Sequence, residues 1–321
     1  MSDPLLKILS DGQVHSGEEL GSALGISRAA VWKRLQKLQE LNVPLISVKG
    51  AGYKVDGGLD LLSREVVLDL LSDKTRSLIQ SLQIRDEVGS TNQVALEGAG
   101  AVKSGFVCAA EQQTAGRGRR GRSWISRFGS SLCFSVRWEY AGGVATLEGL
   151  SLAVGVAISE GLQDAGVSDV QLKWPNDILL DGRKLGGVLI ELSGDASGPC
   201  CAVVGIGLNV RMPSEEVAID QPWSDLSAHL DSRVSRNRLL SCLLNRVMPL
   251  LDEFDRVGFG YFRDAWLKRD AYYGRPVMLM LGAKQVSGIE RGVDSKGALL
   301  LLTEEGESSF SGGEISMRPG N

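Results

Sequence analysis

Residues 170–191, with the sequence VQLKWPNDILLDGRKLGGVLIE, predict a pair of strands at the centre of the chain. In Val170–Trp174 apolar and polar side chains alternate with the period of a strand, and Pro175 ends that strand. Asp181-Gly182 is a strong signal for a two-residue hairpin turn. The register expected from this turn places Leu179 opposite Lys184, Asp177 opposite Gly186 and Asn176 opposite Gly187.

The two glycines after the turn indicate a slot for a ligand. Residues without side chains opposite Asn176 and Asp177 leave room beside the strand. Lys173 and Lys184 then lie on rigid elements, where cations can stabilise charge that develops during a reaction. The alternative is that both lysines are ordinary solvated strand positions.

Residues 112–124, QQTAGRGRRGRSW, carry four arginines and three glycines between Gly116 and Arg122. The glycine spacing loosely matches a dinucleotide fingerprint and a Walker A loop. Both motifs need a strand leading directly in and a helix leading out. Here residues 111–114 separate the strand Phe106–Ala110 from the glycines, and the strand Leu132–Trp138 follows. We predict a mobile loop whose guanidinium groups bind a phosphate or carboxylate and which closes over it; the alternative is an exposed basic loop without a ligand.

A further segment, Ala202–Val210, predicts a buried strand interrupted by Gly205 and Gly207. Asn209 lies among apolar residues and must find hydrogen-bond partners, either in the core or on a ligand. The chain contains no G-x-S-x-G, no H-E-x-x-H and no Cys/His pair near a glycine turn. The expected chemistry is therefore positioning and electrostatic stabilisation of an anionic substrate, without covalent catalysis by a side chain.

The first 57 residues indicate a DNA-binding module. A short helix around Leu5–Leu9 is followed by a helix with the capping box Ser16-x-x-Glu19, and Ser27 caps the next helix. A hairpin about Gly50–Gly52 adds a wing to this helix-turn-helix. Four phosphate contacts predict a slope of log K against log salt of about −3 to −4 per module; the alternative is a three-helix interaction domain. The residues expected at DNA are Ser27, Arg28, Lys33, Arg34, Lys37 and Lys49.

Composition bounds the remaining function classes. The 321 residues suggest two or three domains, and the net charge of −4 excludes a generally basic protein that coats nucleic acid. Residues 27–41 nevertheless hold four basic side chains against Glu40, a local net charge of +3. Five cysteines without C-x-x-C spacing and only two histidines argue against a fixed metal site. The longest weakly polar stretch, Gly149–Ser159, is too short to span a membrane, so we expect a cytoplasmic protein without a membrane partner.

Between and after these motifs the pattern predicts ordinary elements. Asp56-Gly57-Gly58 indicates a hinge, followed by an amphipathic helix over residues 59–72. Helices are expected over Ser235–Gly258, kinked or split at Pro249, and over Tyr261–Arg269. The C-terminal part reads as a small all-β barrel that caps the catalytic domain without chemistry of its own. Its strands are expected at residues 276–281, 285–293, 298–303 and 308–315.

Five motifs in this order resemble those of the bacterial biotin protein ligases. They are EVGSTN (87–92), EQQTAGRGRRGR (111–122), KWPND (173–177), KLGG (184–187) and GIGLN (205–209). With the winged helix-turn-helix in front, the chain resembles the bifunctional class that also represses the biotin operon. The resemblance runs essentially end to end and implies an α+β protein of three domains. These are the DNA-binding domain at 1–57, an α/β ligase domain resembling the class II aminoacyl-tRNA synthetase and biotin ligase fold at 58–272, and an SH3-like domain at 273–321.

The resemblance implies a reaction in two steps. Biotin and ATP with Mg²⁺ give biotinoyl-5′-AMP and pyrophosphate, and a lysine of the biotin carboxyl carrier protein then accepts the acyl group. A homodimer promoted by the adenylate would bind operator DNA. The residues implied around biotin are Ser90, Thr91, Asn92, Gln113, Arg117, Gly118, Arg119 and Lys184. Those implied on the nucleotide side are Trp124, Asn176, Asp177 and Asn209, and the catalytic charges are Lys173, Lys184 and Arg119.

One position departs from the family pattern. The acid that usually stands directly before Ser-Thr-Asn is replaced by Gly89, and Glu87 lies two residues earlier. Two other functions also fit the residues: a ligand-sensing transcription factor without catalysis, and a lipoate ligase. Exchange of labelled pyrophosphate into ATP, with biotin or with lipoate as the acid, distinguishes the three.

Overall fold

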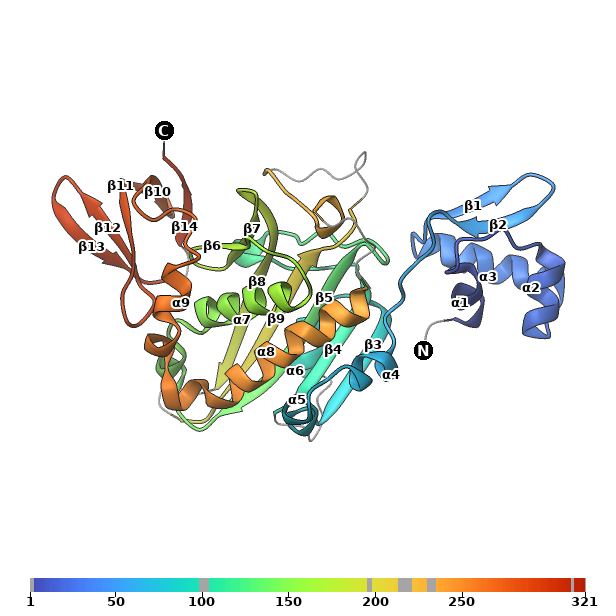
Figure 1. Ribbon diagram of the computed structural model, residues 1–321, viewed down its shortest axis with the longest axis horizontal. Coiled ribbons are helices and arrows are strands. Elements are labelled where there is room, and N and C mark those ends of the chain that lie inside the picture. Colours follow the sequence, from blue (N-terminus) through green and yellow to red (C-terminus); the bar gives the residue numbers. More distant parts are fainter. Residues whose placement is uncertain are drawn as a thin grey trace.

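The computed structural model describes residues 3–97, 104–194, 198–212, 221–229, 235–312 and 315–320. Three units follow one another along the molecule, with the N-terminal unit at one end and a small C-terminal sheet at the other (Figure 1). The N-terminal unit has an apolar core of its own, whereas the central and C-terminal units share one continuous core. The first unit is therefore the more separable part of the chain.

The N-terminal unit is a helix-turn-helix with a wing. The capping box is confirmed, because Ser16 Oγ accepts from Glu19 N at 3.1 Å and Glu19 accepts from Ser16 N at 2.8 Å. Gly25 ends the second helix in the left-handed conformation, and Ser27 Oγ caps the third by accepting from Ala30 N. The elements are α1 (Pro4–Leu9), α2 (Gly17–Leu24), α3 (Arg28–Glu40), β1 (Leu45–Val48) and β2 (Gly52–Val55).

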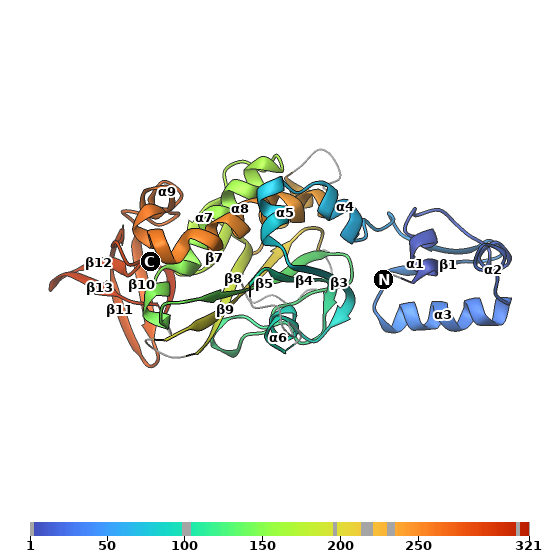
Figure 2. The same ribbon diagram turned by 90° about the horizontal axis from the view of Figure 1, so that it is seen from below.

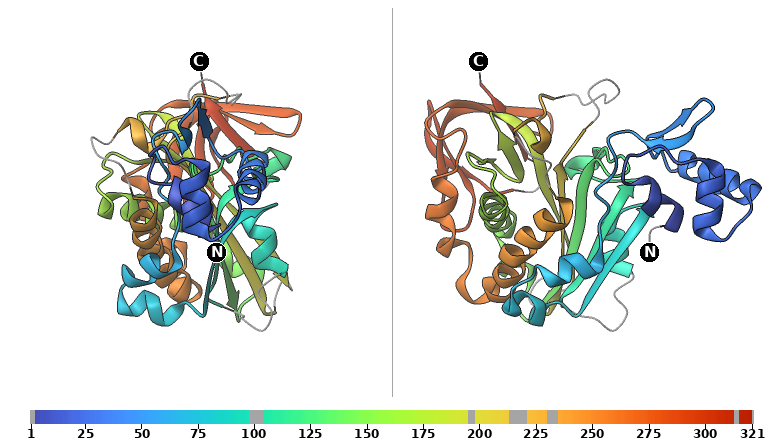
Figure 3. Two further views of the ribbon diagram at one scale, coloured as in Figure 1. Left: turned by 90° about the vertical axis from the view of Figure 1, so that its right-hand side faces the viewer. Right: turned by 45° about the vertical axis from the view of Figure 1, so that its right-hand side comes forward.

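The wing formed by β1 and β2 projects away from the central sheet (Figure 3, right). Beside the hairpin turn, β2 packs tightly on the residues before α2, since His15 and Tyr53 exchange two backbone hydrogen bonds of 2.9 Å. Gly52 is required there: its φ is +146°, and an added Cβ would lie 2.0 Å from His15 O. The wing is thus held at a fixed place beside the helices.

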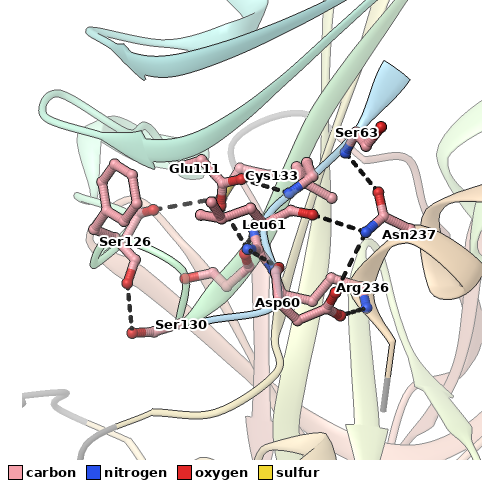
Figure 4. Close-up of polar contacts among 12 residues, drawn as sticks. Asp60, Leu61, Ser63, Glu111, Ser126, Ser130, Cys133, Arg236 and Asn237 are labelled. Carbon is pink, nitrogen blue, oxygen red and sulfur yellow. Dashed lines mark hydrogen bonds and ion pairs between the residues drawn. The ribbon is translucent and has the colours of Figure 1, made fainter. Parts of the chain in front are cut away.

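The connection to the central unit is not helical before Ser63, so the helix predicted over residues 59–72 is confirmed only in part and is shortened to Arg64–Asp69. Only α4 (Arg64–Asp69) and α5 (Asp73–Leu78) are helical in this region. In the linker before Ser63, a backbone N–H group donates to a side chain that is distant in sequence: Leu62 N donates to Glu111 at 2.6 Å (Figure 4). The preceding Gly58 packs against the end of α1, where an added Cβ would lie 2.5 Å from Ser10 O.

An apolar contact also joins the first two units. Phe128 belongs to the loop after the arginine-rich segment, is 2% exposed and lies in the core of the N-terminal unit. Leu59 and Leu61 pack against the same cluster. The N-terminal unit is therefore held on the central unit by a buried aromatic side chain as well as by its linker.

The central unit is a seven-stranded mixed sheet in the order β3-β4-β5-β9-β8-β7-β6, in which only the β3–β4 pair is parallel. Helices α7 (Leu150–Asp164) and α8 (Arg236–Val257) cover one face, and α6 (Thr91–Glu97) lies on the other (Figure 2). Helix α8 continues through Pro249 as a single element. The strands are β3 (Ser81–Val88), β4 (Phe106–Gln113), β5 (Ser131–Tyr140), β6 (Gln171–Lys173), β7 (Asp177–Leu180), β8 (Arg183–Gly194) and β9 (Cys200–Asn209).

The β7–β8 hairpin keeps the predicted turn but shifts the predicted register. Asp181 and Gly182 have φ values of +50° and +68°, as this turn requires. The pairing of Leu179 with Lys184 is confirmed, whereas the other two predicted pairs are wrong by one residue. Leu185 forms a bulge on β8. Between the pairs Leu179–Lys184 and Ile178–Gly186, β8 advances by two residues while β7 advances by one. Beyond the bulge the pairs are Ile178 with Gly186 and Asp177 with Gly187.

Within the described residues, one segment meets the length and composition of a membrane span. It is Val144–Asp164, with a mean hydropathy of 1.3, and 61% of its apolar window is buried inside the fold. The segment contains α7, whose apolar side chains belong to the central core. Its burial is that of a core helix.

The C-terminal unit is an antiparallel sheet in the order β13-β12-β11-β10-β14. The single strand predicted over 308–315 is wrong, because these residues are divided between two strands at opposite edges of the sheet. Among the described residues no pairing joins the two edge strands. The helix expected over Tyr261–Arg269 is reduced to α9 (Arg263–Leu267). The strands are β10 (Pro276–Leu281), β11 (Lys284–Val293), β12 (Leu299–Thr303), β13 (Gly306–Phe310) and β14 (Ile315–Pro319), and 3₁₀ turns lie at Arg119–Gly121, Val144–Leu147, Leu226–Ala228 and Phe259–Tyr261.

Two acidic side chains are buried together beneath this sheet. Glu290 is fully buried, and neither its carboxylate oxygens nor Asp270 Oδ2 has a hydrogen-bond partner among the described residues. Burial, reinforced by the neighbouring Asp270, raises the pKa of Glu290 to about 10. Burial also raises the pKa of Asp270. Glu290 is therefore protonated at pH 7.

We expect Glu290→Gln to flatten the pH dependence of stability. The folded pKa of Glu290 lies above the unfolded value, so its contribution is complete below about pH 4.5 and is lost as the pH rises towards 10. In that window the free energy of unfolding falls by about 1.4 kcal/mol per pH unit for one proton released. Urea unfolding between about pH 6 and pH 9 measures this slope. An equal slope in both proteins would contradict the prediction.

Candidate active site

A pocket of about 910 Å³ opens where β4, the arginine-rich loop, the β7–β8 hairpin and β9 meet. Its volume is typical of small-molecule sites, about 300–1,000 Å³. The structure brings together at this pocket every residue predicted from the sequence for biotin, nucleotide and catalysis. They are Ser90, Thr91, Asn92, Gln113, Arg117, Gly118, Arg119, Trp124, Lys173, Asn176, Asp177, Lys184 and Asn209.

One side of the pocket is a buried polar network at the start of α6. Thr91 donates to Gln113 Oε1 from its backbone N at 2.7 Å and from its hydroxyl at 3.1 Å. Asn92 Nδ2 donates to Glu191 at 2.7 Å and to Leu189 O at 3.3 Å. Because these amides and hydroxyls are held in fixed orientations, they can recognise a polar, uncharged group such as a ureido ring.

A glycine and a serine make room for this network. An added Cβ on Gly205 would lie 2.2 Å from Asn92 Oδ1, so only glycine at this place in β9 admits the amide. The Ser135 hydroxyl lies 2.7 Å from Thr91 Oγ1 and 2.6 Å from Asn92 Oδ1. Gly205 thus has a steric function that the sequence pattern alone did not reveal.

The arginine-rich loop is folded over the pocket as a compact turn. Gly118 N donates to Arg122 O at 2.7 Å, and Trp124 N donates to Gly116 O at 2.9 Å. Arg119 donates to Asn176 Oδ1 at 3.2 Å and to Ile315 O at 3.1 Å, and so connects three parts of the chain. Burial lowers the pKa of Arg119, while Asp177 opposes that shift. The guanidinium stays protonated at neutral pH and faces the pocket as a cation.

Two lysines flank one carboxylate at the centre of the pocket. Asp177 lies 2.6 Å from Lys184 Nζ and 3.3 Å from Lys173 Nζ, and all three side chains are largely buried. Burial disfavours the charged form of Asp177, but the two ammonium groups outweigh it and hold the pKa below its usual value. The three charges sum to +1, and Arg119 adds another. The centre is thus prepared for an anion.

The glycines of the hairpin have separate uses. An added Cβ on Gly186 would lie 2.4 Å from Gly207 O, so this glycine permits close contact between β8 and β9. On Gly187 an added Cβ would lie 3.7 Å from both Asp177 Oδ1 and Lys184 Cε, inside the charged centre. The predicted slot is therefore formed by Gly187 alone.

The opposite side of the pocket carries an aromatic ring and an amide. Trp124 lies against β9 at Gly207, where an added Cβ would be 2.7 Å from the indole. Trp124 Nε1 is buried without a hydrogen-bond partner among the described residues. Asn209 is 4% exposed and donates to Ser224 O at 3.0 Å, so its amide is satisfied within the protein although it lines the pocket. A planar base fits beside such a ring.

Several residues at this site were not predicted. Glu191 pairs with Arg117 at 3.1 Å, and its signal was a charged residue at the end of an otherwise apolar strand. Tyr272, Trp223 and Arg318 line the pocket itself. The C-terminal unit, expected to be a cap without chemistry of its own, contributes β14 to one wall of the pocket, where Ile315 O accepts from Arg119. No local pattern could show this, because the contact joins residues far apart in sequence.

The residues predicted at DNA lie in and beside α3 and on the wing. Lys33 and Lys37 are exposed on the side of α3 opposite its buried apolar residues, and Lys49 is exposed on the wing. Arg34 pairs with Asp3 at 3.5 Å and lies on the flank. Ser27 is used as the cap of α3, and Arg28 follows it in an exposed position. The helix therefore presents a basic surface to solvent.

Comparison with known proteins agrees with this geometry. Residues 86–209 match the biotin/lipoate A/B protein ligase family, residues 4–54 an HTH domain, and residues 272–318 the biotin protein ligase C-terminal domain. The bifunctional ligase/repressor BirA of Escherichia coli (strain K12) is 39% identical over 315 residues, which cover 98% of this chain and 96% of that protein. The chain belongs to the bifunctional biotin protein ligase/repressor family.

Other biotin protein ligases extend the likeness. The bifunctional ligase/repressor BirA of Bacillus subtilis (strain 168) is 28% identical, covering 94% of this chain and 93% of that protein. Biotin protein ligase from Aquifex aeolicus, solved in complex with biotin and ATP, is 32% identical, with a TM-score of 0.66. The match covers 75% of this chain and all of that one. The resemblance inferred from the five motifs is thereby confirmed.

Proposed function

We propose that this ligase/repressor activates biotin with ATP and transfers it to a lysine of the biotin carboxyl carrier protein. With biotinoyl-5′-AMP bound, it represses the transcription of biotin synthesis genes. The observation that carries the proposal is the meeting of Lys173, Lys184 and Arg119 around one pocket. That pocket lies in a chain whose relatives in two bacterial groups are named bifunctional ligase/repressors.

The first step joins two anions, and the cations of the pocket serve it. An oxygen of the biotin carboxylate forms a bond to the α-phosphorus of ATP, and the bond from that phosphorus to the bridging oxygen breaks. Pyrophosphate leaves, and biotinoyl-5′-AMP remains. Lys184, Lys173 and Arg119 lower the repulsion between carboxylate and phosphate and stabilise the charge on the transferring group.

The second step consumes the adenylate. The acceptor lysine, in its neutral amine form, attacks the acyl carbon; AMP leaves as the anhydride bond breaks, and the amine loses a proton. Because this anhydride hydrolyses in water, the folded loop over residues 114–124 protects it until the carrier protein arrives.

The proposed roles of individual residues are those that the family resemblance implies, and the arrangement of the pocket supports them. Ser90, Thr91, Asn92 and Gln113 bind the biotin ring, and Arg117 and Gly118 lie with Arg119 and Lys184 near its carboxylate. Trp124 covers the adenine, and Asn176, Asp177 and Asn209 lie on the nucleotide side. The described residues contain no group of three or more His, Cys, Asp or Glu side chains that could hold a metal ion. Mg²⁺ therefore enters with the phosphates of ATP.

We propose the domain bounds, the location and the partners of the protein on the same basis. The domains are 1–57, 58–272 and 273–321, the last of them an SH3-like barrel. The protein acts in the cytoplasm, and its partners are the carrier protein, operator DNA and a second copy of itself in the adenylate-bound homodimer. A ligand promotes that dimer only through its higher affinity for the dimer than for the monomer.

Pyrophosphate exchange tests the proposal. With biotin present, labelled pyrophosphate is expected to enter ATP, because adenylate formation is reversible. Exchange with lipoate in place of biotin would identify a lipoate ligase. Absence of exchange with either acid would leave a ligand-sensing transcription factor and refute the ligase.

We expect Lys33→Ala to change the salt dependence of operator binding. Each phosphate contact contributes about −0.9 to the slope of log K against log salt, so the slope of about −3 to −4 per module should become shallower by about one. Affinity should fall to a similar extent on all DNA sequences, because a phosphate contact carries no sequence information. Lys7→Ala, exposed on α1, is the matched control. Equal slopes for Lys33→Ala and the control would exclude Lys33 from the interface.

A further inference from the structure

Three polar side chains form a chain of polar contacts at the edge of the pocket, outside the predicted catalytic set. Ser224 Oγ and His229 Nε2 are 2.7 Å apart, and His229 Nδ1 lies 3.2 Å from Asp181 Oδ2. The order of groups is that of a serine hydrolase triad. Ser224, however, is only 4% exposed and is not among the residues that line the pocket. Its hydroxyl is therefore not placed to attack a substrate, and the chain of contacts needs another explanation.

The chain connects two walls of the pocket. Asp181 belongs to the turn of the β7–β8 hairpin, which carries Asp177 and Lys184. Ser224 and His229 belong to the segment 221–229, whose first residues, Gln221, Pro222 and Trp223, line the pocket. His229 thus fastens the hairpin turn to the segment that forms the adjacent wall.

The same segment binds the backbone of Lys184 directly. Lys184 N donates to Pro222 O at 3.0 Å, and Ser224 N donates to Lys184 O at 2.9 Å. The segment therefore runs beside β8 as a short parallel bridge, from Trp223 to Lys184. Any displacement of residues 222–224 moves the backbone from which the Lys184 ammonium reaches Asp177.

Other contacts fasten the segment on its far side. Asn209 Nδ2 donates to Ser224 O at 3.0 Å, and Met212 N donates to Asp225 Oδ2 at 2.7 Å. These contacts hold the segment to β9 and to the residues that follow it. With His229 on the side of the hairpin, residues 222–224 are clamped between β9 and the β7–β8 turn.

We propose that His229 is a positioning residue for the ATP-dependent step, acting with Asp181 and Ser224 to hold Lys184 and the Trp223 wall in place. This inference rests on the proposed function. His229 touches neither the charged centre nor the polar network at α6 in the contacts above. Its loss should therefore affect the nucleotide side, where Trp223 and Asn209 lie, more than biotin, whose ring contacts with Ser90–Asn92 stay unchanged although its carboxylate lies near Lys184.

The test compares His229→Ala with the wild-type full chain in biotin-dependent pyrophosphate exchange. We expect the KM for ATP to rise about three- to tenfold, the change expected for the loss of one hydrogen bond, with a smaller change in kcat. The Kd for biotin, measured by calorimetry without ATP, should stay within about twofold. His15→Ala is the matched control, because the other histidine of the chain is similarly exposed and lies in the N-terminal unit.

Conservative variants separate the contact of His229 with Asp181 from its contact with Ser224. In His229→Asn the amide keeps a donor near the Nδ1 position towards Asp181, and in His229→Gln it keeps a polar group near the Nε2 position towards Ser224. Partial rescue of the KM for ATP by either variant is expected, since each retains one contact. Asp181→Gly, which suits the positive φ of this turn position, and Ser224→Ala each remove a single contact and apply the same test should His229→Ala fail to fold.

The outcomes are distinct. No exchange by the wild-type protein would refute the proposed ligase function itself. Exchange by the wild-type protein, with an unchanged KM for ATP in folded His229→Ala, would overturn the positioning role alone. A change in biotin affinity equal to the change for ATP would also overturn it, because the clamp would then act on the whole pocket. Labelling of Ser224 by a fluorophosphonate probe would overturn it in favour of a nucleophilic serine.

Discussion

Lys184→Ala is expected to lower biotin-dependent pyrophosphate exchange by about 100- to 1,000-fold. Lys184 Nζ is 2.6 Å from Asp177 and is largely buried, so its charge acts at short range in a pocket of low polarity. Without it, Asp177 is left with Lys173 at 3.3 Å, and the charge of this trio falls from +1 to zero. The repulsion between the carboxylate of biotin and the phosphates of ATP is then less compensated by positive charge. The barrier to adenylate formation therefore rises.

The neighbouring residue provides the control for this prediction. Arg183 precedes Lys184 on β8, carries the same charge and is exposed to solvent. Arg183→Ala should keep exchange within about twofold of the wild type, because exposed charges interact weakly with the pocket. The thermal unfolding midpoint of Lys184→Ala identifies any loss of fold. Exchange by Lys184→Ala within a few-fold of the wild type would remove Lys184 from the reaction.

Local sequence signals predicted those parts of the fold that depend on neighbouring residues. The capping box of Ser16 and Glu19 and the turn at Asp181-Gly182 are fixed by contacts within four residues, and both occur as predicted. The bulge at Leu185 was missed because an apolar residue there fits a regular strand equally well. The pairing of β8 with β9, which places Gly187 opposite Gly207, joins residues distant in sequence and was not predicted either.

In the pocket, too, local features were predicted and contacts between distant residues were not. Its predicted residues meet because the motifs lie at strand ends and turns that the sheet order brings together. The polar contact of Asn92 with Glu191 and that of Arg119 with Ile315 O join elements 99 and 196 residues apart. A pattern read along one segment contains no information on such contacts. The C-terminal wall was therefore beyond prediction from residue patterns.

The linker to the DNA-binding unit shows how distant contacts override a local pattern. Residues 59–72 have the spacing of an amphipathic helix, yet residues 59–63 are not helical. Leu62 N is bound by Glu111, 49 residues away, and Ser63 N by Asn237, 174 residues away. Each of these backbone groups would need a different partner inside a helix. The helix consequently begins only after Ser63.

These contacts depend on a buried ion pair between Glu111 and Arg236 (Figure 4). The Arg236 guanidinium lies 2.5 Å from Glu111 Oε2 and donates to Ser131 O at 3.0 Å and to Asp60 O at 3.1 Å. Its backbone N also donates to the Asp60 carboxylate. Arg236 is 2% exposed and Glu111 is 1% exposed, so neither charge has access to water. Strand β4, helix α8 and the linker are joined at this one place.

Arg236→Ala is expected to reduce the free energy of unfolding by about 3–5 kcal/mol, because it leaves the Glu111 carboxylate buried without its partner. Glu111→Gln/Arg236→Met removes both charges and should lose much less, since no uncompensated charge remains. Arg238→Ala, exposed two residues later on α8, is the control and should stay within about 0.5 kcal/mol of the wild type. Urea unfolding at pH 7 measures all three variants. Equal losses in Arg236→Ala and the double variant would show that packing and the linker hydrogen bonds, rather than the unpaired charge, determine the cost.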